Sequence, residues 1–205
     1  MRDFPREIQN HSEMSGDPQL EALLIAMRSA LAAGEGRDAL EGVERGIETL
    51  RVAFQEDPGM AVTGVLFQIV GQLSECGLEL AKHFQETGQT DLEERAWRAR
   101  YDSMATAHTY RRNLIGPVLL DWADCLRRLG REEQAQALYE KVVRDFSQLL
   151  GWGPTFDPDW LVAVQCLERA MDSSSRDFSE LKERTRAVLR QSEQLIEDRA
   201  ATNQV

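Results

Sequence analysis

Apolar residues recur at intervals of three and four along most of the chain from about residue 18 onward, with polar residues between them. This spacing is typical of amphipathic α-helices. The clearest example is residues 116–149, where two such stripes are separated by a single glycine, Gly130. The pattern therefore predicts two antiparallel helices joined by a tight turn. The stripes contain Leu119, Trp122, Ala123, Leu126, Ala135, Leu138, Tyr139 and Val142.

Clusters of glycine, proline and serine divide the remaining apolar stripes into similar pairs. No segment alternates apolar and β-branched residues with the period of two that a strand requires. The sequence thus predicts an all-α fold of about eight helices. We expect a flexible tail over residues 1–17 and a single helical domain over 18–200. The expected helical hairpins cover residues 18–56, 60–114, 117–150 and 158–199.

Side-chain size within the 117–150 hairpin follows a pattern that helix packing explains. Ala123 and Ala135 are small and fall where two helices cross closely, whereas Trp122 and Tyr139 are large. We expect the large pair to pack against the next hairpin. A bulky residue at position 135 should then overpack the crossing and destabilise the protein.

Residues 116–149 resemble a tetratricopeptide repeat (TPR), a helix–turn–helix unit with large and small apolar residues before a glycine and an alanine–aromatic series after it. Residues 20–53 match this pattern more weakly, and around Gly88 the expected small residue is replaced by Glu93. The resemblance implies a TPR-like right-handed array of hairpins. The matching positions are Leu119, Trp122, Ala123, Leu126, Gly130, Ala135 and Tyr139, with Val142 in place of the usual small residue.

The same resemblance implies a concave surface, lined by the first helix of each hairpin, that holds a peptide or a partner's helix. On the 117–129 helix this surface would present Leu120, Asp124, Arg127 and Arg128. Some TPR proteins grip a terminal carboxylate with lysine, asparagine and arginine. Leu120 and Asp124 depart from that set, so carboxylate recognition is not expected. The implied function is that of a non-enzymatic protein-interaction scaffold or adaptor.

Aromatic residues cluster around the glycine- and proline-rich segment 151–158, where Trp152 and Phe156 precede Trp160. One interpretation is a hydrophobic plug between the third and fourth hairpins, and the other is an exposed aromatic binding loop. We favour the plug, because aromatic side chains beside helix ends usually fill gaps between packed layers.

The chain carries 35 acidic and 24 basic residues, a formal net charge of −11. Such a charge repels phosphate backbones and argues against nucleic-acid binding. The only mildly positive segment, 91–112, contains arginines that could receive an acidic or phosphorylated peptide. Nearby acids make salt-bridged arginines the expected arrangement. These arginines are Arg95, Arg98, Arg111 and Arg112.

The longest weakly polar stretch, residues 60–74, is too short to span a bilayer, so no membrane contact is expected. Cys76, Cys125 and Cys166 are isolated within apolar stripes and predict buried thiols in a reducing compartment. With no secretory signal evident, we expect a cytoplasmic protein.

Three histidines, His11, His83 and His108, have no helical spacing that would pair two of them on a metal, so neither metal nor cofactor is expected. Glu93-Glu94 and Glu132-Glu133 fall in first helical turns, where carboxylates offset the helix dipole. Nothing in these residues indicates catalysis.

Two other interpretations remain open. The helices could enclose a small-molecule pocket lined by Trp97, Tyr101 and Tyr110, which would make the protein a regulatory or ligand-sensing domain. The second is that the protein is an enzyme whose chemistry no sequence motif indicates. Homodimerisation is also expected if an apolar stripe of the last helix pairs with a second copy. That stripe contains Phe178, Leu181, Val188 and Leu195.

Overall fold

The structure is a computed structural model that describes residues 18–56, 64–106 and 112–202. These residues form eight α-helices and one short 3₁₀ helix, with no strand among them, which confirms the all-α prediction. The expected tail lies outside the described residues. The elements are α1 (Pro18–Ala33), α2 (Gly36–Glu56), α3 (Gly64–Glu86), α4 (Thr90–Thr106), α5 (Arg112–Arg128), α6 (Glu132–Phe146), η3 (Ser147–Trp152), α7 (Pro158–Ser173) and α8 (Ser179–Thr202).

The first three hairpins turn through the same backbone geometry. Each turn contains one glycine with a positive φ, namely Gly34 (79°), Gly88 (71°) and Gly130 (71°). Glycine adopts this left-handed conformation at little cost. The conformation ends a helix by directing a following N–H group to hydrogen-bond with a carbonyl of the last helical turn. The residue after each glycine donates its N–H to the carbonyl five residues earlier: Glu35 to Ala30 at 2.9 Å, Gln89 to Phe84 at 2.8 Å, and Arg131 to Leu126 at 2.9 Å.

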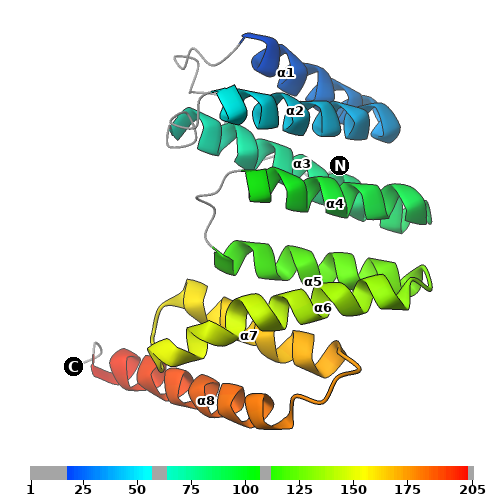
Figure 1. Ribbon diagram of the computed structural model, residues 1–205. Coiled ribbons are helices and arrows are strands. Elements are labelled where there is room, and N and C mark those ends of the chain that lie inside the picture. The colour runs from blue at the N-terminus through cyan, green and yellow to red at the C-terminus, as the bar shows by residue number, and fades with distance from the viewer. Residues whose placement is uncertain (1–17, 57–63, 107–111, 203–205) are drawn as a thin grey trace.

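The hairpins stack in chain order, from α1 at one end to α8 at the other (Figure 1). Stacking differs along the array. Helix α2 packs against both α3 and α4, and α7 packs against both α5 and α6, whereas the second and third hairpins pack against each other through one helix from each, α4 and α5. The buried apolar residues accordingly form two cores, one centred on α1–α4 and one on α5–α8.

The structure places most of the TPR-like positions of the third hairpin where the sequence predicts them. Gly130 forms the turn, and Ala123 and Ala135 are completely buried. Trp122 is the exception, because it faces α4 of the preceding hairpin and contacts Tyr101 there, with 5.8 Å between the ring centroids and the two rings tilted by 39°. The expectation that it packs against the next hairpin is wrong. The other positions, Leu119, Leu126, Tyr139 and Val142, are buried in the second core.

The boundary between the second and third hairpins also differs from the expected one. Helix α4 ends at Thr106, and α5 begins at Arg112, so that Pro117 lies inside a helix instead of preceding it. A proline this close to a helix start removes only one backbone bond. Gly116 allows α5 and Phe146 to pack closely, because a Cβ atom at this position would lie 2.4 Å from Cε2 of Phe146.

Cys76, Cys125 and Cys166 are free and buried, as the sequence predicts. Burial raises the pKa of Cys76 and Cys166 to about 11 and that of Cys125 to about 12. These thiols are therefore protonated near neutral pH. No helix in the described part of the chain is both long and apolar enough to cross a membrane.

Candidate interaction surfaces

The surface predicted on α5 is largely occupied within the chain. Leu120 is 1% exposed and belongs to the second core, so its assignment to a partner-binding surface is wrong. The physical reason is that α5 contacts α4, α6 and α7, which leaves only a narrow strip of the helix uncovered.

Asp124, the next residue predicted on that surface, is held by three partners from three helices. It accepts hydrogen bonds from the Tyr139 hydroxyl at 2.5 Å, from Arg127 at 3.2 Å and from Arg169 at 2.5 Å. Burial, together with the bond to the Asp124 carboxylate, raises the pKa of Tyr139 to about 12. The group ties α5 to α6 and α7, and the guanidinium of Arg127 also lies 5.9 Å from the Tyr139 ring centroid.

Two buried carboxylates join the second hairpin to the third. Glu93 is 1% exposed and accepts hydrogen bonds from Trp97 Nε1 at 3.3 Å and from the guanidinium of Arg128. Glu94 accepts from Trp122 Nε1 at 3.1 Å. We call this group the polar seam; its members are Glu93, Glu94, Trp97, Arg98, Trp122, Arg128 and Arg131.

Glu93 occupies a repeat position that is otherwise small. Counting from the turn glycines, Ala39, Glu93 and Ala135 are equivalent, and all three are essentially buried. Compensation of the helix dipole therefore explains only part of the role of Glu93, because its carboxylate also pairs with Arg128 on α5. Arg128, predicted to face a partner, is engaged in the same contact.

The arginines of α4 confirm the salt-bridge expectation where the structure describes them. Arg95 donates from Nε at 3.1 Å and from a terminal nitrogen at 2.8 Å to Glu44 of α2. Arg98 pairs with Glu94 at 2.7 Å. The side chains of Arg111 and Arg112 lie outside the described residues.

The three aromatic residues of segment 151–160 differ in burial, so neither interpretation holds for all of them. Trp160 is buried in the second core and so confirms the plug for that residue. Trp152 is 77% exposed and Phe156 is 53% exposed, so the plug interpretation is wrong for both. The cause is local: the Asp157 carboxylate accepts from the N–H of Asp159 at 3.0 Å and starts α7, which turns Trp160 inward and leaves the preceding aromatics outside the helix.

Phe156 and its loop lie beside an uncovered part of α8, and η3, which ends at Trp152, also contacts α8. The N–H of Thr155 donates to Ser192 Oγ at 3.2 Å, and the Arg199 guanidinium lies 4.5 Å from the Phe156 ring centroid. Leu195 and Ile196 continue the stripe that is buried at Val188, Leu189 and Ser192, yet they are 39% and 38% exposed. We call this surface the terminal patch; it consists of Trp152, Phe156, Leu195, Ile196 and Arg199.

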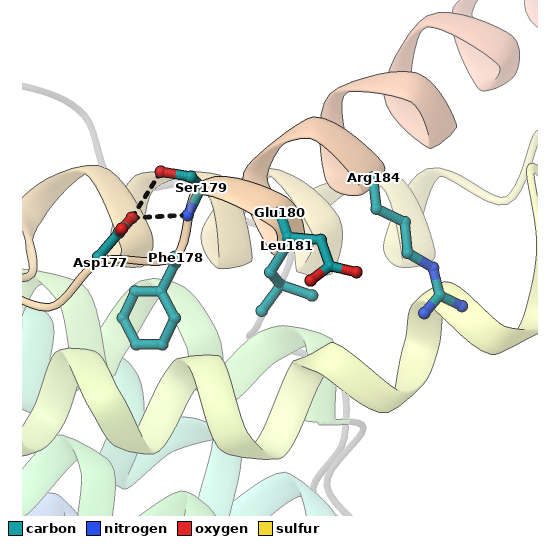
Figure 2. A pocket seen from close by; sticks show the side chains of 6 residues that line it. All are labelled: Asp177, Phe178, Ser179, Glu180, Leu181 and Arg184. Carbon is teal, nitrogen blue, oxygen red and sulfur yellow. Dashed lines mark hydrogen bonds between the residues drawn. The ribbon is translucent and has the colours of Figure 1, made fainter.

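Two hollows occur elsewhere among the described residues. One of about 550 Å³ lies at the start of α8. There the Asp177 carboxylate accepts a hydrogen bond from the N–H of Ser179 at 2.9 Å (Figure 2). That bond caps the helix, which is a structural role. The lining residues are Asp177, Phe178, Ser179, Glu180, Leu181 and Arg184.

The second hollow, of about 320 Å³, lies between α4, α5 and α6. Tyr101, Ile115, Leu119 and Phe146 supply its apolar side chains, and Lys141 and Arg144 are among its polar ones. Of the residues predicted to line a ligand pocket, Tyr101 is therefore found here. Trp97 belongs to the polar seam, and Tyr110 lies outside the described residues, as do His11 and His108.

The paired helices and glycine turns define a TPR-like helical-repeat fold. Two solved chains, both described as TPR-like repeats of a Podosopora anserina kinesin light chain, match this one. The first has 20% identity and a TM-score of 0.44, covering 92% of this chain and 83% of that one. The second has 19% identity and a TM-score of 0.41, covering 85% and 97%. No protein-family profile and no curated protein matches the chain.

Proposed function

We propose that the protein is a non-enzymatic, cytoplasmic scaffold or adaptor that binds a peptide or helix of a partner protein through its helical-hairpin surfaces. The terminal patch is the principal contact in this proposal. The observation that carries it is the exposure of Trp152 and Phe156, together with the position of Phe156 beside the uncovered stripe of α8.

Aromatic side chains are energetically favoured anchors at protein interfaces because they bury a large area and lose few degrees of freedom. An exposed apolar group rimmed by polar residues is typical of a surface that meets another molecule. Here the loop that carries Phe156 is tied to α8 through Thr155 and Ser192. A partner would thus meet a largely preformed surface, which lowers the entropic cost of binding.

The resemblance-based alternative, the first-helix surface of α5, has less to offer a partner. The side chains of Asp124, Arg127 and Arg128 already contact one another or other helices of the chain. A partner would have to compete with these internal ion pairs before gaining new ones.

Affinity capture with the full chain tests the proposal. We expect wild-type protein to retain one or more proteins that the double variant Trp152→Ser/Phe156→Ser loses. Val52→Ser serves as the control, because Val52 is an exposed apolar residue on α2, far from the patch in sequence. Retention of the same proteins by the wild type and the double variant would contradict the proposal.

A second candidate, small-ligand sensing, is favoured by the 320 Å³ hollow, whose volume lies at the lower end of those that hold small molecules. A ligand bound there should raise the melting temperature of the wild type. Tyr101→Ala should abolish that shift, while Tyr101→Phe should keep it. A metabolite panel that produces no Tyr101-dependent shift would remove this candidate.

A further inference from the structure

We infer that the terminal patch is the docking site for a basic amphipathic helix of a partner protein. This inference rests on the proposed function and specifies the chemistry of the partner. It follows from the shape of the uncovered stripe, from the charges around it, and from a contact that the chain already makes with its own arginine.

The shape of the patch fits a helix. Helix α8 has 24 residues, whereas α7 has 16, so α8 continues beyond the helix that covers it. Leu195, Ile196 and Arg199 repeat at the spacing of one helical face and extend the buried stripe of Val188 and Ser192. Within the array, this stripe packs against another helix, namely α7. A partner helix would continue the same packing.

The charge around the patch fits a basic partner. Residues 151–162 and 191–202 together contain five acids and one base, a local balance of −4. At 100° per residue, Glu193 and Asp198 flank the Leu195–Ile196 stripe on its two sides. Lysine or arginine residues beside the apolar stripe of a partner helix would face these carboxylates. The acids are Asp157, Asp159, Glu193, Glu197 and Asp198, and the base is Arg199.

The patch already binds a guanidinium from its own chain. Arg199 lies over Phe156 at a distance where an aromatic ring attracts a cation. Trp152, which is 77% exposed, offers a larger ring with the same property, since indole is the strongest such acceptor among aromatic side chains. An arginine or lysine of the partner helix would contact Trp152 in this way.

The same charges disfavour a second copy of the chain as the occupant. Pairing of two patches around a two-fold axis would bring Glu193 and Asp198 of both copies to one interface, with Arg199 from each to offset them. Like charges at short range oppose such pairing, and they oppose an acidic helix for the same reason.

A panel of three fluorescein-labelled helical peptides tests the inference by fluorescence anisotropy. The peptides share one apolar stripe and carry lysine and arginine, glutamine, or glutamate on its flanks. We expect the basic peptide to bind the full chain at least about tenfold more tightly than the neutral one, the acidic peptide not to bind, and added salt to weaken the basic complex.

Three variants locate the binding. Trp152→Ser/Phe156→Ser should weaken the basic peptide by at least about tenfold, as expected for loss of aromatic anchors. Glu193→Gln/Glu197→Gln/Asp198→Asn should weaken it by about threefold or more and reduce its salt dependence. The control Glu75→Gln/Glu79→Gln/Glu86→Gln removes three exposed acids from α3 and should leave the affinity unchanged within about twofold. Circular dichroism melts confirm that each variant is folded.

Equal binding of the neutral and basic peptides, no effect of the α8 triple variant, or an equal effect of the α3 control would overturn the inference. So would light scattering that shows a dimer, at tens of micromolar, that the aromatic double variant disrupts. If no peptide binds while patch-dependent capture persists, the basic-helix inference fails and the proposed function stands. If patch-dependent capture also fails, both fail.

Discussion

The polar seam buries charged groups, whereas the terminal patch exposes aromatic ones. At the seam, the carboxylates of Glu93 and Glu94 are buried and accept hydrogen bonds from two tryptophans. At the patch, Trp152 and Phe156 stand in solvent at 77% and 53% exposure. Each region departs from the general rule that charged groups are exposed and aromatic groups are covered.

The difference shows how one repeated hairpin serves two purposes. The seam satisfies its polar groups inside the chain, because Glu93 finds Trp97 and Arg128, so it offers little to an external partner. The patch leaves apolar area uncovered at the end of the array. The seam is therefore expected to control stability, and the patch is expected to control binding.

The largest expected effect comes from overpacking the α5–α6 hairpin, which contributes Arg128 to the seam and is followed directly by η3. Ala135 is completely buried on α6, within the second core. Ala135→Trp should lower the free energy of unfolding by about 3 kcal/mol or more, because the indole has no space there. Urea denaturation followed by circular dichroism measures the loss. Ala137→Trp, at an exposed position of the same helix, is the control, and equal stability of the two variants would contradict the packing.

Breaking the seam should have the next largest effect. Glu93→Ala removes the acceptor for the Trp97 indole and the partner of Arg128, which should cost about 2 kcal/mol. Glu93→Gln keeps an acceptor oxygen and should cost less. Urea denaturation compares both with Glu133→Ala, an exposed acid in the first turn of α6, which should change stability by less than about 0.5 kcal/mol. If Glu93→Ala resembles Glu133→Ala, the seam does not stabilise the protein.

Alkaline pH provides a second probe of the seam. Burial, reinforced by the charge of Glu93, raises the pKa of Cys125 from 9.0 to about 12. A raised pKa in the folded state contributes stability that is full below pH 9 and is lost as the pH rises toward 12. Glu93→Gln removes a negative neighbour and should lower this pKa, so the total loss of stability at alkaline pH should be smaller and should level off at a lower pH.

Thermal melts at several pH values measure this loss, which should be on the order of 1 kcal/mol by pH 10 for one thiol. Cys125→Ala should reduce the alkaline loss further, because it removes the titrating group. An unchanged pH profile in both variants would show that Cys125 does not contribute to the pH dependence.

The smallest effect on stability is expected at the patch. Trp152→Ser/Phe156→Ser removes two exposed rings and should change the free energy of unfolding by no more than about 0.5 kcal/mol. Chemical denaturation under the same conditions provides the comparison with Glu93→Ala. A loss as large as that of the seam variant would mean that the aromatics hold the fold together, which would contradict their assignment to binding.

Much of the fold is predictable because its signals are local. Turn glycines such as Gly130 and stripes such as Leu119–Leu126 depend on neighbours within one or two helical turns. The seam is different, because Glu93 and Arg128 are 35 residues apart and meet only through the stacking of α4 on α5. The sequence misplaces Leu120 for the same reason: the stripe pattern does not reveal that α5 contacts three other helices.

Some of the patch could have been recognised from the sequence. Asp157-Pro158 is a helix-start signal that places Trp160 inside α7 and Phe156 before it. The unequal lengths of the last two helices also indicate an uncovered end. Neither signal shows that Arg199 lies over Phe156, because that contact depends on how the loop crosses α8.

The most direct test of the account uses 5-fluorotryptophan-labelled protein and ¹⁹F NMR, since the four tryptophans divide among the two regions and the core. Single Trp→Phe variants assign the signals. On addition of the basic helical peptide, we expect the Trp152 signal to shift and the signals of Trp97 and Trp122 in the seam to stay unchanged. Shifts of Trp97 and Trp122 with Trp152 unchanged would contradict this expectation.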